Sequence, residues 1–164
     1  MKPSQETEII AALLDQSAAA HHQQPCPRQV LGARMGLFAG ELLGIDLPSK
    51  DKHLLVIAET DGCAIDGLVA ATGCHVGNRT LRIVDLGKVA ATFVDIHTED
   101  ALRLVPRREA RQAASAYAPA AKSAWEAMLF GYQVMPSADL FSIQRVELTN
   151  SLTQMISRPG KKAI

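Results

Sequence analysis

The sequence has few cysteines, no excess of either charge and no long apolar run, and each shortage argues against a class of protein. Its three cysteines are an odd number without repeating spacing, and the opening MKPSQETEII lacks the apolar stretch of a secretory signal. We therefore expect a reducing, cytoplasmic setting. Basic and acidic residues number 17 each, which removes any whole-chain attraction to nucleic acid or an anionic membrane. The longest apolar runs, such as LLVIA at 54–58, are far too short to span a bilayer.

A chain of this length buries one sizeable core, and we expect a core domain over residues 1–150 and a tail over 151–164. The expected elements, in order, are a helix after a cap at Ser4, an extended loop over 17–27, a helix over 27–44, a strand at 53–60, a helix at 62–72, strands at 80–87, 88–96 and 101–107, a long helix from 107 to 132 with a bend or break at Pro119, and a strand at 141–148. Helices followed by several strands favour an α+β fold, with helices packed on a mixed or antiparallel sheet, over a doubly wound parallel sheet.

Glycines recur every four residues in the second expected helix, at positions 32, 36 and 40. They leave one side of that helix as bare backbone, which another element can approach closely. We interpret this stripe as a site of close packing.

Two of the three cysteines stand at expected helix starts. Cys26 directly precedes the helix that begins at Pro27, and Cys63 lies in the first turn of the next helix. Free backbone N–H groups and the helix dipole favour a thiolate at such positions. Cys74 lies eleven positions after Cys63, or roughly 16 Å along a continuous helix. These two therefore cannot share one ion, and Cys74 is best explained as a packing residue.

Histidines and acidic residues near these cysteines offer further chemistry. His22 and His21 lie four and five residues before Cys26, and an imidazole that met Cys26 and Cys63 would complete a sulfur and nitrogen set suited to zinc or another divalent transition metal. Spacing alone favours free buried cysteines and a surface histidine pair over such a site. Cys63 and Asp66 are candidate catalytic groups, although Asp66 also suits a solvated helix face.

Two other sets carry weaker signals. His53, His75 and His97 are scattered at strand or turn edges, and we expect no site from them. The run PRREARQ at 106–112 is either the solvent-exposed first turn of a helix or a site that holds an anion.

Three stretches occur in order along the chain: Cys26–Pro27 with LGARMG, then ETDGCAIDGLVAATGCHVG, then DLGKVAATFVD. Together they resemble the FmdE-like proteins, a family named after a component of formylmethanofuran dehydrogenase. The resemblance spans roughly residues 20–150. It implies an α+β core, an intertwined homodimer and a cleft whose histidine and cysteines bind a metal. The matching residues here are His22, Cys26 and Cys63.

The sequence departs from the family at two places. The first family motif reads H-G-H-x-C-P, and here residues 22–27 read HQQPCP, so Gln24 replaces the second histidine and His21 is an offset substitute. Many relatives also continue into a zinc ribbon with four cysteines, and the tail over 151–164 contains none.

The family name refers to an enzyme complex that oxidises a formyl group with molybdenum or tungsten, but the number and spacing of cysteines here do not support an iron–sulfur cluster. Three functions therefore stay open. The first is a zinc-binding cleft protein. The second is a non-enzymatic accessory protein that delivers a metal or cofactor to a molybdenum or tungsten enzyme. The third is a metal-free thiol enzyme with Cys63 as nucleophile and His22 as base.

Overall fold

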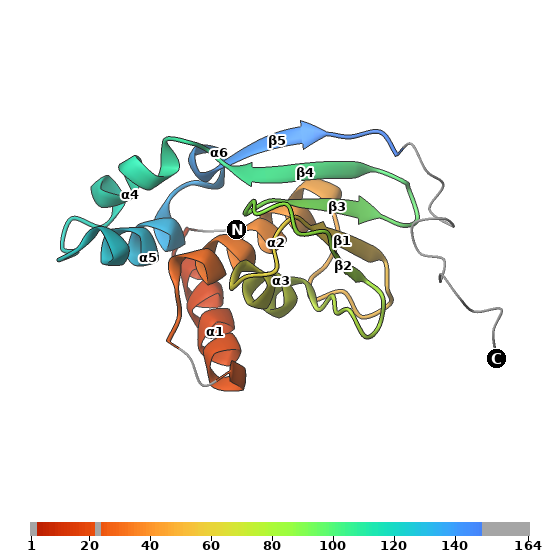
Figure 1. Ribbon diagram of the computed structural model, residues 1–164, viewed down its shortest axis with the longest axis horizontal. Helices are drawn as coiled ribbons and strands as arrows, with labels where there is room; N and C mark the ends of the chain where they lie inside the picture. The colour runs from red at the N-terminus through yellow and green to blue at the C-terminus, as the bar shows by residue number, and fades with distance from the viewer. Residues whose placement is uncertain (1–2, 22–23, 149–164) are drawn as a thin grey trace.

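The computed structural model describes residues 3–21 and 24–148, with the backbone alone for residues 3, 4 and 18–21. The elements in these ranges are α1 (Pro3–His21), α2 (Pro27–Leu43), β1 (Leu54–Ala58), α3 (Ala64–Thr72), β2 (Leu81–Ile83), β3 (Ala91–Asp95), β4 (Ala101–Pro106), α4 (Ala110–Tyr117), α5 (Ala124–Val134), α6 (Ser137–Leu140) and β5 (Phe141–Arg145). They confirm the predicted α+β fold (Figure 1). None of the described helices combines the length and apolarity needed to cross a bilayer. The predicted tail over 151–164 lies outside the described residues.

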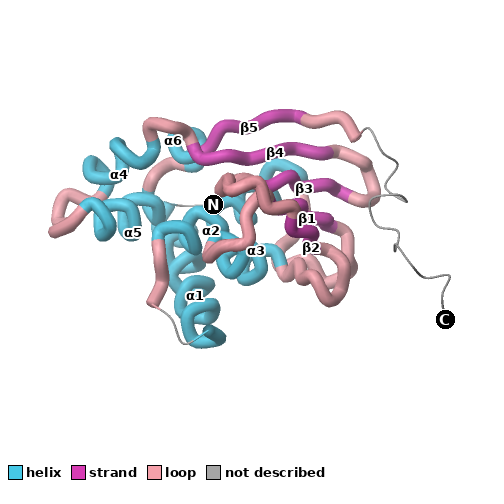
Figure 2. Tube along the Cα trace, in the orientation of Figure 1, coloured by secondary structure: helices cyan, strands magenta, loops and turns pink. Residues whose placement is uncertain are grey.

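The strands form one mixed sheet in the order β2-β1-β3-β4-β5. Only the pair of β1 with β2 is parallel among the described strands, and the other three pairs are antiparallel. One face of the sheet packs against the helices, and Figure 2 shows α2 and α3 beside it. Fully buried core residues include Val30 and Met35 of α2 and Leu54, Val56, Phe93, Leu102 and Leu104 of the strands.

The two strands on either side of Gly87 are shorter than predicted and are not neighbours, because β2 and β3 lie on opposite sides of β1. The segment between them crosses the carboxyl end of β1. There the carbonyl oxygen of Glu59 accepts the N–H groups of Leu86 and Lys88 at 2.9 and 3.0 Å. Gly87 adopts a φ of 65°, which glycine tolerates better than other residues.

The long helix expected over 107–132 is two helices, α4 and α5, separated at residues 118–123, which include Pro119. Ser123 starts α5 by accepting the backbone N–H of Glu126 at 3.1 Å. A methyl group on Gly131 would lie 2.4 Å from the carbonyl oxygen of Ala114, so this glycine lets α5 fold back tightly on α4.

Helix α1 differs from its prediction at both ends. It begins at Pro3, so Ser4 lies inside the first turn and is not a cap, and it continues to His21 through the first part of the predicted loop. The alanine run at 18–20 favours helix strongly enough to extend it. Ile10 and Leu14 are buried residues of its apolar face.

Helices α2 and α3 run side by side in the same direction, in contact along a seam of small residues. A methyl group on Gly32 would lie 2.0 Å from the carbonyl oxygen of Ala64, and one on Gly67 would lie 2.0 Å from that of Gln29. Further along, Gly36 meets the side chains of Ala71 and Thr72. The glycine stripe is therefore a close-packing surface, and the amino ends of the two helices lie together.

A buried arginine joins α2 to the carboxyl end of α5. The Arg34 side chain is 2% exposed. Its guanidinium donates to the carbonyl oxygens of Gln133 and Met135, each at 2.8 Å, and to the Ser137 hydroxyl at 2.9 Å. Glu6 of α1 lies 3.4 Å from Nε of the same side chain. Arg34 thus satisfies carbonyls that the end of α5 leaves unpaired, and it fixes three helices relative to one another.

The other face of the sheet carries an ion pair between Glu59, just after β1, and Arg103 of β4. The Arg103 guanidinium donates to both carboxylate oxygens of Glu59, with Nη2 to Oε2 at 2.7 Å, and to Gln144 at 3.0 Å. This interaction with Arg103 is the main reason that the pKa of Glu59 is lowered.

We expect Gly32→Ala to destabilise the protein by about 3 kcal/mol or more, because the added methyl meets a backbone oxygen that no rotamer change can move. Gly77→Ala is the control, since a methyl group there meets nothing within 4 Å. Urea unfolding of both variants tests the contact. Equal stability of the two would contradict it.

Arg103→Gln should lower the free energy of unfolding by about 1–2 kcal/mol at neutral pH. A carboxyl group whose pKa is lowered by folding contributes stability above its unfolded value, and this contribution is lost as the pH falls through the folded value. The difference between wild type and variant should therefore shrink on acidification below about pH 4. Chemical unfolding at several pH values measures it, with the exposed Arg145→Gln as control. A difference that does not vary with pH would refute this role for Glu59.

Candidate functional site

Cys26 and Cys63 line one cleft with a volume of about 460 Å³. Each residue is the N-cap of its helix, Cys26 of α2 and Cys63 of α3, and each is half-buried. The contact between the two parallel helices brings these amino ends together. The positive ends of two helix dipoles therefore meet at the cleft, where they favour negative charge.

The two thiols lie within hydrogen-bonding reach of one another. The side-chain interaction with Cys26 stabilises the protonated thiol and is the largest cause that raises the pKa of Cys63, and burial and the charge of Asp66 act in the same direction. Cys63 consequently keeps its proton more firmly than an ordinary cysteine when no cation is near. That direction disfavours the metal-free thiol nucleophile among the three functions considered from sequence.

The backbone around Cys26 is held before α2 begins. Cys26 is extended, with φ −123° and ψ 158°. Its N–H donates to the side-chain oxygen of Gln29 at 2.9 Å, and the amide nitrogen of Gln29 donates to Ser17 of α1 at 3.3 Å. Gln29 is 1% exposed, so the thiol is set on a rigid support that includes α1.

The rest of the cleft wall is apolar and basic. Of the described residues that line it, the charged ones are Arg28 and Arg111, and the others include Leu31, Val89, Trp125, Met128 and Tyr132. Arg111 is close enough to Tyr132 that its charge partly offsets the rise in the Tyr132 pKa caused by burial. Because Arg34 anchors the carboxyl end of α5, the α5 side of this wall has a fixed position.

The other residues predicted for the site are not among the described residues that line this cleft. His22 lies outside the described residues, and His21 is the last residue of α1 with an undescribed side chain. Asp66 lines a neighbouring cavity between α1 and α3. Its charge still reaches Cys63. Cys74 is 1% exposed, and its sulfur lies 3.4 Å from the carbonyl oxygen of Leu54, which fits the packing interpretation.

Sequence reasoning missed two sets of residues. The PRREARQ run is predicted to be either a solvated first turn or an anion site, and its Arg111 lines the cleft. Nothing suggested that Trp125 would join the same wall.

The second missed set contains histidines that were expected to form no site. His53, Asp95 and His97 come together as a group with one ligand atom each within 4.8 Å of the others, an arrangement that could hold a metal ion. The antiparallel pairing of β1 with β3 brings these residues together, since it sets Leu54 opposite Asp95.

Comparison with solved structures supports the fold. A crystal structure of a tungsten formylmethanofuran dehydrogenase FmdE-like protein from Syntrophus aciditrophicus matches with a TM-score of 0.61. The match covers 89% of this chain and 75% of the other, with 19% identical residues.

Among curated proteins, a probable S-adenosyl-L-methionine-binding protein of Archaeoglobus fulgidus is 41% identical over 80 residues. The match covers 47% of this chain but only 22% of that relative's length.

A family model described as FmdE, molybdenum formylmethanofuran dehydrogenase operon, matches residues 21–142. This match includes both cleft cysteines and most of the sheet, and it ends within the first residues of β5. The chain belongs to the FmdE family.

Proposed function

We propose that this FmdE-like protein binds a divalent transition metal ion through Cys26, Cys63 and His22, and that this ion is zinc. The observation that carries the proposal is the pair of cysteines at the amino ends of two parallel helices, facing one cleft. The side-chain interaction between the two thiols supports a site in which both sulfurs bind one ion. His22 lies four residues before Cys26 in the sequence. Two sulfurs and one nitrogen suit zinc and leave a fourth position open.

The bound ion would supply Lewis acidity, either to a water molecule or to a carbonyl group of a ligand. The protein's own residues would then do the binding and orientation. Asp66 is the nearest candidate for moving a proton at Cys63, since its charge reaches that thiol from the first turn of α3.

The lining of the cleft indicates the class of ligand. Arg28 and Arg111 are basic, and the helix amino ends add positive potential, so an anionic group such as a carboxylate or phosphate is favoured. Trp125 and Met128 offer an apolar wall for a planar or apolar body. S-adenosyl-L-methionine, named for the Archaeoglobus relative, has a carboxylate that the arginines would attract and a sulfonium that they would repel. Anionic ligands therefore rank above it.

The alternative is a non-enzymatic accessory protein that delivers a metal or cofactor to a molybdenum or tungsten enzyme. The family description refers to such an operon, and α5 exposes Trp125, Phe130 and Val134 by 47%, 51% and 46%. These apolar side chains suit a protein partner, either that enzyme or a second copy of this chain in the homodimer that the family resemblance implies. The free state of all three cysteines is compatible with a cytoplasmic location. Co-purification from the native host separates the two functions, because a free homodimer that converts a small molecule would count against the accessory role.

Cobalt(II) reports the proposed metal site, since cysteine sulfur bound to it gives an intense charge-transfer absorption. We expect this absorption in the wild-type chain and in Cys74→Ser, and its loss in Cys26→Ser and in Cys63→Ser. His22→Ala should weaken cobalt binding at least about tenfold, whereas His21→Ala should leave it unchanged. Identical spectra for the Cys26, Cys63 and Cys74 variants would reject the site.

The preference of the cleft for anions can be measured through the fluorescence of Trp125, the chain's single tryptophan. Benzoate should change the tryptophan fluorescence in a saturable manner, and neutral benzamide should not. Arg111→Ala should weaken benzoate binding about fivefold, as expected for loss of one charge contact of about 1 kcal/mol. The control is Arg108→Ala, an exposed arginine three residues away that is not among the lining residues. Equal binding of benzoate and benzamide would contradict the preference.

A further inference from the structure

A second group of metal-ligating side chains lies at the opposite end of β1 from the cysteine cleft. His53 immediately precedes β1, Asp95 ends β3, and His97 follows in the next turn. The backbone register holds them together, because the N–H of Ile96 donates to the carbonyl oxygen of His53 at 2.9 Å. Cys63 follows the other end of β1, and five strand residues span roughly 17 Å. The two groups are therefore separate sites.

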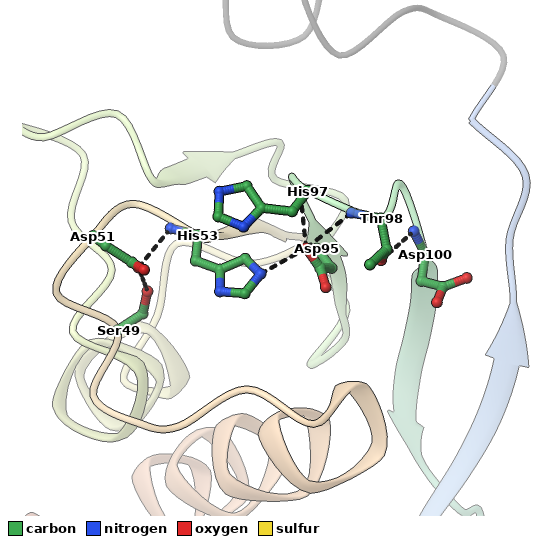
Figure 3. A network of polar contacts seen from close by, with 7 residues as sticks. All are labelled: Ser49, Asp51, His53, Asp95, His97, Thr98 and Asp100. Atoms are coloured by element: carbon green, nitrogen blue, oxygen red, sulfur yellow. Dashed lines mark hydrogen bonds and ion pairs between the residues drawn. The ribbon is translucent and has the colours of Figure 1, made fainter.

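The three side chains face one another across a small space (Figure 3). His53 Nε2 lies 2.8 Å from Asp95 Oδ1. The rings of His53 and His97 stack with centroids 4.0 Å apart and an interplanar angle of 25°. Asp95 is 4% exposed, and its Oδ1 also accepts the backbone N–H groups of His97 and Thr98 at 2.8 and 3.2 Å. The backbone thus fixes the carboxylate beside the two stacked imidazoles.

The short contact between His53 and Asp95 pairs the imidazole with the carboxylate, but its geometry is not that of a hydrogen bond. The buried Nε2 atom of His53 has no hydrogen-bond partner among the described residues, although Asp95 Oδ1 is close to it. A cation could accept the lone pair of this nitrogen and the negative charge of the carboxylate together.

We propose that His53, Asp95 and His97 form a second metal site, selective for zinc and similar transition metals. Two imidazole nitrogens and one carboxylate oxygen suit zinc, cobalt or nickel and not the hard cations magnesium and calcium. Donors around a tetrahedral zinc ion lie roughly 3.4 Å apart at bond lengths near 2.1 Å. The ligand atoms of the group lie within 4.8 Å of one another, so metal binding would draw the farthest pair closer, and His97 is exposed.

The fourth coordination position would face a cavity of about 530 Å³ beside His53. Its wall is formed by residues 44–51, and Asp51 there accepts the backbone N–H of His53 at 3.1 Å. Water or a small ligand can reach the ion from this side. An ion here would also link the start of β1 to the end of β3, so it should stabilise the fold.

The test uses the full chain carrying Cys26→Ser and Cys63→Ser, so that success or failure of the cysteine site does not affect the result. After removal of metal by a chelator, zinc chloride is titrated by calorimetry, with magnesium chloride in parallel. We expect zinc to bind with one-to-one stoichiometry and to raise the melting temperature. Magnesium should do neither. Cobalt(II) should give visible d–d absorption without sulfur charge transfer.

In this background, His97→Ala and His53→Ala should each weaken zinc binding at least about tenfold. His75→Ala is the matched control, an exposed histidine outside the group. His97 is itself exposed, so its removal should leave the fold intact, and circular dichroism verifies this. Asp95→Asn tests the carboxylate while it keeps an acceptor for the two backbone N–H groups. Equal zinc affinity in His97→Ala and His75→Ala, or no zinc binding in the background chain, would overturn the proposal.

Discussion

The close contact between α2 and α3 is the constraint on which the cleft depends. At Gly32 and Gly67 the backbone of one helix touches that of the other, so neither position has room for a side chain. The contact fixes the distance between the helices, and because they are parallel it also brings their amino ends together. Cys26 and Cys63 are the N-caps at those ends. Two thiols that are far apart in sequence become neighbours through the packing of helix interiors, and no local motif is needed.

Other interactions turn this pair of helix ends into a cleft. Arg34 binds the carbonyls at the end of α5 and so holds that helix against α2, which sets the position of Trp125 and Met128 on the cleft wall. The hydrogen bonds of Gln29 to Cys26 and Ser17 tie the site to α1 as well. The result is a partly buried thiol pair with basic residues and apolar surface beside it, which suits a bound cation together with an anionic ligand. The fold itself is shared with an FmdE-like protein at 19% identity, so the side chains of the cleft, and not the fold, must determine the ligand.

Much of this architecture could be predicted from the sequence because local signals agreed with the packing. Helix α2 ends at Gly44 as expected, with a positive φ, and the break at Pro119 separates α4 from α5. The failures arose where distant segments decide the outcome. The position of β2, on the opposite side of β1 from β3, depends on the path that the chain takes around Thr80. The meeting of His53 with Asp95 and His97 depends on strand register, and the place of Trp125 depends on Arg34. None of these relations leaves a pattern in the neighbouring residues.

The two proposed sites lie at opposite ends of β1, with Cys26 and Cys63 near its carboxyl end and His53, Asp95 and His97 near its amino end. The central claim is that the two sulfurs meet at one point. X-ray absorption at the zinc edge measures this most directly, on the full His97→Ala chain loaded with one equivalent of zinc. The account predicts two sulfur neighbours at about 2.3 Å. A shell of nitrogen and oxygen alone would contradict it.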